Sequence, residues 1–534
     1  MVAASPHIGT FARDGLPPRD QWPVLHFNRP ELQYPEMLNA ATVLLDDALA
    51  EGHGARTALL HGDRRLSYAE LATLTDAIGG WLADDFAVRP GDRVLLRGAN
   101  TPELFAAWLA VVKIGAIVVP TMPLLRRREL ATVLRRARPV VALCEPGLEG
   151  ELEDALADTS AEMPCRMAPL VTPDRTPTPL AAAPTRADDI CLIAFTSGTT
   201  GEPKACLHFH RDVLAMCDGF ARHILAPTPD AIFTGTPPIA FTFGLGALLA
   251  FPLRFRAAAA LSAGAGPDAL AQTIARHRAT HVFTSPTGYR AMLAQAPAPD
   301  LSSLTASVSA GEHLNAVTWA AWHSATGLRM IEGIGSTEMM HIFLSTTAAN
   351  ARPGSVGKPV PGYEAALLDP AGRAIEGEAT GRLAVRGPTG CRYMGDARQA
   401  NYVVDGWNVT GDVFARDAGG YYRYVARSDD MIVSSGYNIS GPEIESVLME
   451  HPQVHECAVL GMPDAERGQI VRAVIVPAAG AAGDDALAEA LKAHVKARLS
   501  PYKYPRRIDF RTSLPRTANG KLQRHLLADS AADG

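Results

Sequence analysis

The chain has 534 residues, too many for one compact core, so two to four domains are expected. Its hydrophobic content of 47% and charged content of 20% are ordinary for a soluble globular protein. The formal net charge is -6 and the sequence has no basic cluster, so nothing indicates a surface that binds nucleic acid. The expected partner is a small molecule.

The seven cysteines are scattered and form no C-x-x-C pair, so the sequence indicates neither a zinc site nor a disulfide framework. The N-terminal segment lacks the apolar core of a secretory signal. The longest apolar stretch, residues 104–119, is broken by Lys113 and Gly115 and falls short of the roughly 20 apolar residues of a membrane span. We therefore expect a cytoplasmic protein without a membrane span.

Residues 1 to about 35 are rich in proline and charge and predict a mostly irregular segment. From about residue 57 onward, helix and strand signals alternate. The sequence Ser67-Tyr-Ala-Glu70 is a capping box that begins a helix. The patterns predict helices over 67–84, from 101 and over 267–278, and strands over 93–96, 117–119 and 281–284. Such alternation predicts α/β layers with largely parallel sheets.

After about residue 355, short strand-like runs separated by glycine and aspartate predict an antiparallel, barrel-like subdomain over about 355–426. Past Arg427, two helix patterns and two strand patterns predict a separate small core. The fold class is therefore α/β: an N-terminal domain of mixed and parallel sheets flanked by helices over 1–426, a hinge over 427–430, and a small, mobile α+β domain over 431–534.

The segment Phe195-Thr-Ser-Gly-Thr-Thr-Gly-Glu-Pro-Lys204 follows an apolar strand over 190–194, where parallel sheets present ligands. Gly198 and Gly201 allow the backbone to turn its N–H groups inward. Phosphate oxygens would find further donors in the Lys204 ammonium and in the hydroxyls of Thr196, Ser197, Thr199 and Thr200. A Ser/Thr/Gly-rich surface turn is the alternative, but the preceding strand and the Pro-Lys end favour a polyphosphate loop. It is not a Walker A loop, because no G-K-[ST] ends it.

This loop resembles the signature of the adenylate-forming enzymes, the superfamily of acyl-CoA synthetases, peptide-synthetase adenylation domains and luciferases. Four further motifs follow in that superfamily's order: Gly333-Ile-Gly-Ser-Thr-Glu338, Thr410-Gly-Asp412, Arg427-Ser-Asp429-Asp430 with Ser435-Gly-Tyr-Asn-Ile-Ser440, and Pro515-Arg-Thr-Ala-Asn-Gly-Lys521. The resemblance therefore spans residues 196–521. It departs at Ala205 and Ala426, where the superfamily usually has glycine.

The resemblance implies ATP, Mg2+ and coenzyme A, and catalytic roles for Lys521, Glu338, Thr337 and Lys204. Glu338 would hold Mg2+ against the ATP phosphates. Lys521 would neutralise charge that develops at the α-phosphorus. Asp412 would accept the ribose hydroxyls, and Arg427 would donate to ribose or phosphate. Besides these and the residues of the polyphosphate loop, the nucleotide site would include Gly311, Glu312, Glu332, Gly333, Ile334, Ser336 and Thr337.

In the superfamily, the small domain rotates about the hinge between two half-reactions, adenylation of the acid and transfer to a thiol. The resemblance makes Asp429 the pivot of this rotation. The pantetheine arm of coenzyme A would then pass Ser435, Gly436, Tyr437 and Asn438.

The predicted acyl pocket consists of Phe241, Thr242, Phe243, Gly244, Ala310, Gly335, His341 and Ile342. Its segment from Gly333 to Phe343 is similar to that of benzoate-CoA ligases, and the Ala-Phe-Thr-Phe-Gly-Leu-Gly run to that of 2-aminobenzoate (anthranilate)-CoA ligases. A flat slot between Phe243 and Gly335 would suit an aromatic ring, and a short pocket would exclude a fatty chain. Thr242 or His341 would accept a hydrogen bond from an ortho amino group. The alternative is that these residues are packed core.

We therefore expect an aryl-CoA ligase that acts on anthranilate or, as second choice, benzoate. The nearest rival is a stand-alone adenylation enzyme that loads a carrier protein in trans. A silent nucleotide-binding regulator is disfavoured, because both Lys521 and Glu338 are present. The sequence leaves a homodimer open.

Overall fold

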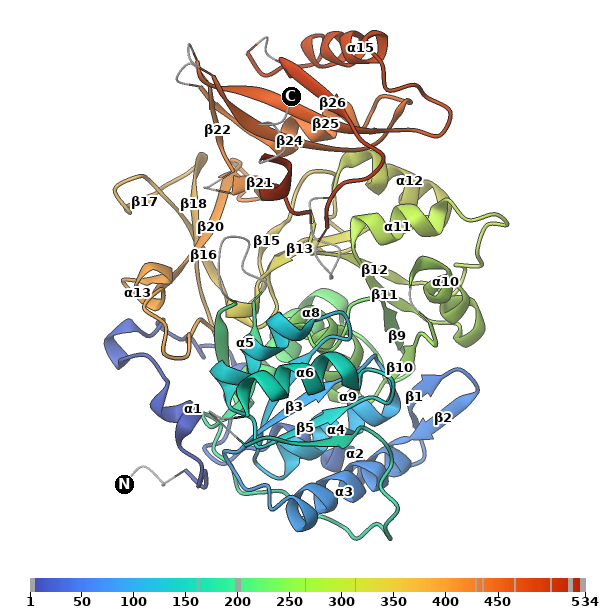
Figure 1. The fold of residues 1–534 in the computed structure, drawn as a ribbon, viewed down its shortest axis with the longest axis vertical. Coiled ribbons are helices and arrows are strands. Elements are labelled where there is room, and N and C mark those ends of the chain that lie inside the picture. The colour runs from blue at the N-terminus through green and yellow to red at the C-terminus, as the bar shows by residue number, and fades with distance from the viewer. Residues whose placement is uncertain are drawn as a thin grey trace.

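The computed structural model describes the chain except residues 1–4, 161–163, 197–202, 265, 313, 428–429, 435–436, 465–466, 500–501, 517–521 and 529–534. Figure 1 shows a large N-terminal part of the chain with a small C-terminal part, in orange and red, above it. Within the described ranges, no helix has both the length and the apolar character needed to cross a membrane.

The first sheet of the large domain has six strands, parallel except for the β7–β8 pair. Their spatial order is β6 (Arg166–Pro169), β5 (Val141–Cys144), β3 (Arg93–Arg97), β4 (Ile117–Thr121), β7 (Ile190–Phe195) and β8 (Ala205–Phe209). Successive side chains of a strand point to opposite faces. Leu95 therefore packs with α5 (Arg127–Ala137) and α6 (Glu149–Thr159) on one face, and Val94 and Leu96 with α3 (Tyr68–Asp85) and α4 (Pro102–Lys113) on the other.

The predicted helix starts in this layer are confirmed. The Ser67 side chain accepts a hydrogen bond from the Glu70 backbone N–H, and the Glu70 carboxylate accepts one from the Ser67 N–H at 2.7 Å. Thr101 caps α4 in the same manner, by accepting from the Leu104 N–H. The apolar stretch 104–119 is thus most of α4 followed by the buried start of β4.

The second sheet has nine strands, with a parallel centre and antiparallel edges. Their order is β15 (Lys358–Pro359), β14 (Ile342–Ser345), β13 (Ile331–Gly335), β12 (Ala306–Ser309), β11 (His281–Thr284), β9 (Ile232–Gly235), β10 (Ala258–Leu261), β1 (Thr57–His61) and β2 (Arg64–Ser67). Val282 packs with α10 (Gly266–His277), α11 (Pro286–Leu293) and α12 (Ala316–Thr326).

Phe283, on the opposite face of β11, packs into the main core. That core includes residues of α7 (His210–Met216), η4 (Cys217–Leu225), η5 (Leu245–Ala250) and α9 (Phe251–Arg254), and the short α8 (Thr242–Gly244) directly precedes η5. The remaining elements of the N-terminal region are short: α1 (Phe11–Asp14), η1 (Arg19–Gln21), η2 (Pro30–Leu32), η3 (Thr42–Asp46) and α2 (Asp47–Ala50).

The predicted antiparallel subdomain is confirmed, since every pair in its sheet is antiparallel. The sheet has the order β17 (Ala374–Ile375), β16 (Glu364–Leu368), β18 (Ala379–Arg386), β20 (Trp407–Arg416) and β19 (Val403–Val404), with β21 (Tyr422–Arg427) against β20 and the short α13 (Gln399–Tyr402) before β19. Arg427, placed in the predicted hinge, is the last residue of β21.

The small C-terminal part packs around its own core, which includes Ile444, Ile475 and Leu491. Its elements are β22 (Ile432–Ser434), β23 (Tyr437–Ile439), α14 (Gly441–Leu448), β24 (Val454–Asp464), β25 (Gly468–Pro477), α15 (Asp485–Lys496), β26 (Arg507–Phe510) and α16 (His525–Ala528). β26 joins β25 in parallel, and the other pairs are antiparallel, as a small α+β domain requires.

A fully buried ion pair ties α7, which follows β8 of the first sheet, to the segment that precedes α13. Arg392 Nη1 donates to Asp212 Oδ2 at 2.8 Å, and neither side chain is exposed. Burial is the largest influence on Asp212 and opposes its ionisation, but Arg392, His208 and Arg211 together outweigh it and hold the Asp212 pKa at about 2. The same segment pairs with β8 through an antiparallel bridge between Cys206 and Tyr393.

Asp212→Asn should destabilise the folded protein by about 3–5 kcal/mol, because it leaves the Arg392 charge buried without its counter-ion. Thermal and urea unfolding would measure the change. Asp369→Asn removes the partner of the exposed Arg373 and serves as the matched control, with no expected shift of the unfolding midpoint. Equal midpoints for the two variants would contradict this account of the buried pair.

Candidate active site

The polyphosphate loop is held between two paired strands. Phe195 at the end of β7 pairs with Ala205 at the start of β8, and the Thr196 N–H donates to the Lys204 carbonyl at 3.0 Å. The Thr196 hydroxyl is buried and has no hydrogen-bond partner among the described residues. A buried hydroxyl without a partner is unusual, so it fits a donor reserved for a ligand. The other loop residues lie outside the described residues: Ser197, Gly198, Thr199, Thr200 and Gly201.

Lys204 and Glu338 are brought together by a residue that sequence reasoning missed. Lys204 Nζ donates to the Tyr393 hydroxyl at 2.7 Å, and that hydroxyl donates to Glu338 Oε1 at 2.5 Å. Lys204 Nζ lies 3.6 Å from the same Glu338 oxygen. Burial and the Glu338 charge raise the Tyr393 pKa far above its ordinary value, so the hydroxyl stays protonated and can donate. No motif of the superfamily quoted above covers Tyr393.

Glu338 sits in a tight 3-10 turn, η6 (Thr337–Met339), directly after β13. Ser336 begins the turn, since its side chain accepts from the Met339 N–H at 3.3 Å. Glu338 is 8% exposed and offers a carboxylate oxygen, the hard ligand that Mg2+ prefers. No cluster of three or more candidate metal-ligating side chains occurs in the described part of the chain. One carboxylate fits a magnesium ion that is held mostly by phosphates and water.

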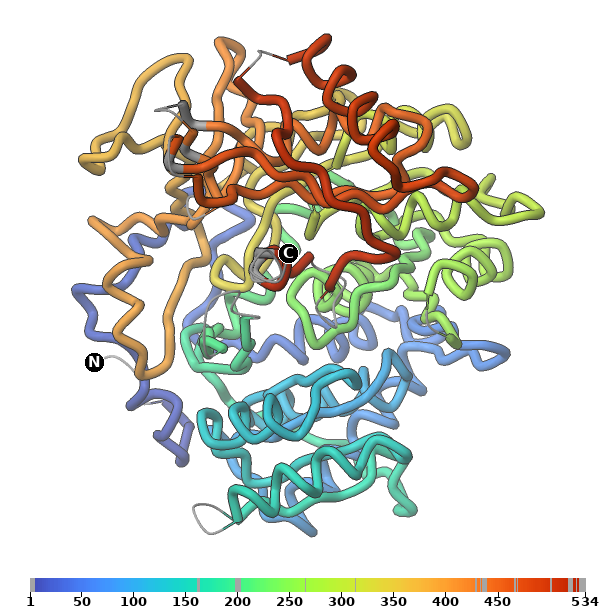
Figure 2. The backbone as a smooth tube through the Cα atoms, turned by 45° about the horizontal axis from the view of Figure 1, so that its top comes forward, coloured from blue at the N-terminus to red at the C-terminus, as the bar shows by residue number. Residues whose placement is uncertain are grey.

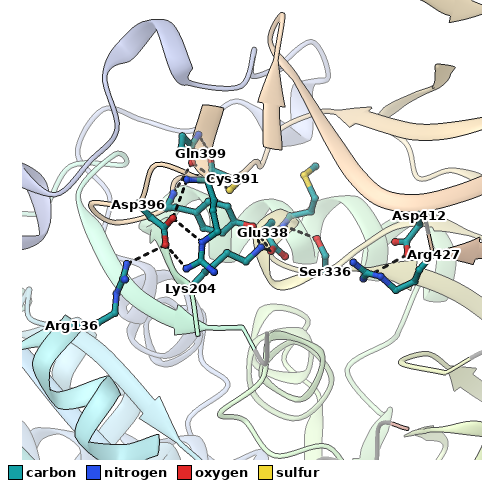
Figure 3. Close-up of polar contacts among 12 residues, drawn as sticks. Arg136, Lys204, Ser336, Glu338, Cys391, Asp396, Gln399, Asp412 and Arg427 are labelled. Carbon is teal, nitrogen blue, oxygen red and sulfur yellow. Dashed lines mark hydrogen bonds and ion pairs between the residues drawn. The ribbon is translucent and has the colours of Figure 1, made fainter. Parts of the chain in front are cut away.

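Asp412 and Arg427 face each other across the antiparallel pair β20–β21, with Arg427 Nη1 3.8 Å from Asp412 Oδ1. In the view of Figure 3 this pair lies on the far side of Ser336 from Glu338. A Cβ on Gly411 would come within 2.6 Å of Arg427 Nη2, so glycine leaves room for the guanidinium. The carboxylate and the guanidinium therefore lie side by side across this strand pair. Asp429, the predicted pivot, lies outside the described residues.

The predicted adenine side follows the ends of β12 and β13. Gly311 has φ +89, a conformation that favours glycine, and it carries the chain from β12 to Glu312. Glu332 in β13 is buried, and burial raises its pKa to about 8, so its carboxyl is mostly protonated at neutral pH. Its Oε2 has no partner within the described ranges. Gly333 and Ile334 continue β13, where a Cβ on Gly333 would come within 2.7 Å of Ile342.

Around the predicted acyl pocket lies a group of rings that we call the aromatic cluster: Phe220, Phe243, Phe251, Phe283 and His341. His341 is the shared member, with ring centroids 5.2 Å from Phe220, 5.8 Å from Phe243 and 4.8 Å from Phe251. Burial lowers the His341 pKa to about 3, so the imidazole is neutral. Neither ring nitrogen makes a well-formed hydrogen bond in the part of the chain that the structure describes, although the Phe243 backbone acts on the ring in the direction that raises its pKa.

Two glycines allow neighbouring backbone to lie close to His341. A Cβ on Gly246 would come within 2.7 Å of the imidazole, and one on Gly335 within 2.4 Å of the His341 carbonyl oxygen. Thr242 and Gly244 are buried in α8, Phe241 precedes that helix, and Ala310 is 9% exposed. The predicted pocket residues Phe243 and His341 thus lie together, and sequence reasoning did not place Phe220, Phe251 and Phe283 beside them. Their positions in η4, α9 and β11 give no local signal, since buried aromatic residues are ordinary core.

The predicted pantetheine and lysine residues are only partly described. Tyr437 and Asn438 lie in β23 and pair with Ser434 and Val433 of β22. Ser435, Gly436 and Lys521 lie outside the described residues.

Two family models match the chain. The AMP-binding enzyme model matches residues 47–393, and the AMP-binding enzyme C-terminal domain model matches residues 443–521. The benzoate-CoA ligase of Thauera aromatica is 35% identical over 517 residues, which cover 93% of this chain and 97% of that protein.

Solved structures agree with these matches. The anthranilate CoA ligase AuaEII, solved in complex with anthranoyl-AMP, is 34% identical, with a TM-score of 0.88 over 94% of this chain and 99% of that one. A benzoate CoA ligase from Burkholderia xenovorans LB400 is 31% identical, with a TM-score of 0.84 over 92% of this chain and 100% of that one. The chain therefore belongs to the AMP-binding enzyme family, the adenylate-forming superfamily, and within it is similar to benzoate-CoA and anthranilate-CoA ligases.

Proposed function

We propose that this protein is an AMP-forming aryl-CoA ligase, an acid–thiol ligase that converts an aromatic carboxylate, ATP and CoA into the aryl-CoA, AMP and pyrophosphate. The observation that carries the aromatic substrate is the aromatic cluster, in which flat rings surround a neutral, buried imidazole. The relatives named as benzoate-CoA and hydroxybenzoate-CoA ligases support the same class of acid.

In the first half-reaction, a carboxylate oxygen attacks the α-phosphorus of ATP, and the bond to pyrophosphate breaks. Lys204 and the Thr196 hydroxyl would donate to the phosphates, and Glu338 would hold Mg2+, which neutralises phosphate charge when bound. Lys521 would stabilise the charge that develops at the α-phosphorus. In the second half-reaction, the CoA sulfur attacks the acyl carbonyl, AMP leaves, and the thiol proton passes to solvent. These steps depend mainly on positioning and charge stabilisation.

Within the aryl acids, we propose 2-aminobenzoate as the preferred substrate and benzoate as the next. Among the residues described, the Phe243 backbone is the one polar group that acts on the His341 ring, and neither ring nitrogen makes a well-formed hydrogen bond. A buried nitrogen without such a bond is costly. An ortho amino group could donate to one of them, which would recover that cost on binding. Benzoate has the same ring and carboxylate but no such donor.

The test of this function is AMP release with benzoate, anthranilate, salicylate and hexanoate, each with and without CoA. We expect CoA-dependent AMP release with the three aromatic acids, highest with anthranilate, and formation of free aryl-CoA. Preference for hexanoate would overturn the aryl assignment. Acid-dependent pyrophosphate exchange without release of aryl-CoA would favour the rival, a stand-alone enzyme that loads a carrier protein.

His341→Leu should lower kcat/KM for anthranilate by about 5- to 150-fold, the cost of one buried hydrogen bond, and change that for benzoate much less. The ratio of the two values is the readout, since loss of folded protein lowers both equally. His281→Leu is the matched control, because His281 is also buried and stacks on Phe233 outside the aromatic cluster. Equal losses for both acids would count against His341 as the selecting group.

Tyr393→Phe should slow acid-dependent pyrophosphate exchange by roughly 10- to 150-fold, because it removes a hydroxyl that joins two charged groups. The variant should also need more MgATP for half-maximal rate, since Lys204 and Glu338 lose their common partner. Thioester formation from supplied aryl-AMP should change little. Tyr363→Phe removes a buried hydroxyl bonded to the neutral Thr389 and is the control. A Tyr393→Phe enzyme with wild-type MgATP dependence would argue against this role.

A further inference from the structure

Arg516, near the C-terminal end of the small domain, joins that domain to the large one. Its Nη1 donates to Glu312 Oε1 at 3.0 Å, and its Nη2 donates to Glu456 Oε1. Glu312 follows β12 of the large domain, and Glu456 lies in β24 of the small domain. Figure 2 shows the red end of the chain running down from the small domain onto the green and yellow segments of the large one.

The contact is mostly covered from solvent. The Arg516 side chain is 26% exposed, and those of Glu312 and Glu456 are 20% exposed. The large domain holds Glu312 in place, since Thr287 Oγ1 donates to Glu312 Oε2 at 2.7 Å and Arg290 Nη2 donates to Thr287 at 3.0 Å. Two carboxylates from different domains thus share one guanidinium. Removal of Arg516 would leave Arg290, whose charge also acts on both carboxylates, as the cation beside them, and would remove the direct link between the domains.

Arg516 also stands at the base of the loop that carries the predicted catalytic lysine. Arg516 pairs with Leu522 in an antiparallel bridge, and the Gln523 N–H donates to the Pro515 carbonyl at 2.9 Å. Residues 517–521 between them lie outside the described residues, but the chain is fixed on both sides. On the large-domain side, Glu312 directly follows Gly311 of the predicted adenine side. One ion pair therefore ties the base of the lysine loop to the nucleotide site.

We propose that Arg516 is a positioning residue for the adenylation half-reaction, and that its contacts with Glu312 and Glu456 hold the small domain in the orientation that adenylation uses. Transfer to CoA requires a different orientation of the small domain, so this bridge must open between the two steps. The inference rests on the proposed two-step function. In this proposal Arg516 acts through the placement of Lys521.

The test is Arg516→Met, which keeps the length of the side chain and removes its charge. We expect acid-dependent pyrophosphate exchange to fall about tenfold, the size typical of a partly covered charge pair, while thioester formation from supplied aryl-AMP stays within about twofold. Glu456→Gln, outside the nucleotide site, should reproduce the effect, and adding it to Arg516→Met should lower exchange little further. Arg516→Lys should recover part of the exchange rate.

The matched control is Arg498→Met, which removes the partner of Glu450 within the small domain and should change neither half-reaction. Lys521→Ala supplies the reference for a purely adenylation-specific loss. Equal losses in both half-reactions, or unchanged pyrophosphate exchange, would overturn the role of Arg516. A wild-type enzyme with no acid-dependent AMP release would instead refute the proposed function, so the two failures are distinguishable.

Discussion

The geometry of the candidate site depends on one buried charge pair, Arg392 with Asp212. Their contact fixes the strand-like segment before α13 against β8 and the start of α7. Arg392 is followed directly by Tyr393, and β8 is preceded directly by Lys204. A shift by one residue in this pairing would turn Tyr393 to the opposite face and separate it from Lys204 and Glu338. Burying a charge is costly, so the pair is better explained by the register it enforces than by stability alone.

The motif residues of the candidate site could be predicted because each motif is a short, continuous stretch of sequence. Glycines, hydroxyls and a terminal lysine between two strands predict a phosphate loop, and the resemblance of residues 333–338 to a superfamily motif predicts the role of Glu338. The antiparallel subdomain followed from the change in turn spacing, and the order of motifs identified the family. These features can be predicted without knowing which distant segments of the chain are in contact.

The rest depends on long-range contacts. Tyr393 lies 189 residues from Lys204 and 55 from Glu338 in sequence. No local sequence pattern predicts that its hydroxyl joins these two side chains. Arg516 lies 204 residues from Glu312 and within a motif known for its lysine. Phe220, Phe251 and Phe283 resemble any buried aromatic residue until the fold brings them to His341. Tertiary packing, not propensity, creates these three features.

Charge is unevenly distributed along the site. Toward the polyphosphate loop, Lys204 and Glu338 are paired through a protonated tyrosine, so charge is present but already balanced. Toward the acyl end, burial keeps the His341 imidazole neutral. This end therefore offers no charge that could pair with a charged group. Burial likewise keeps the Glu332 carboxyl mostly protonated at neutral pH on the predicted adenine side. A substrate that carries its only charge on a carboxylate beside a flat apolar ring matches this arrangement. The carboxylate would lie toward the polar end, beside Lys204, and the ring among neutral groups, so that no charge has to be buried at the acyl end.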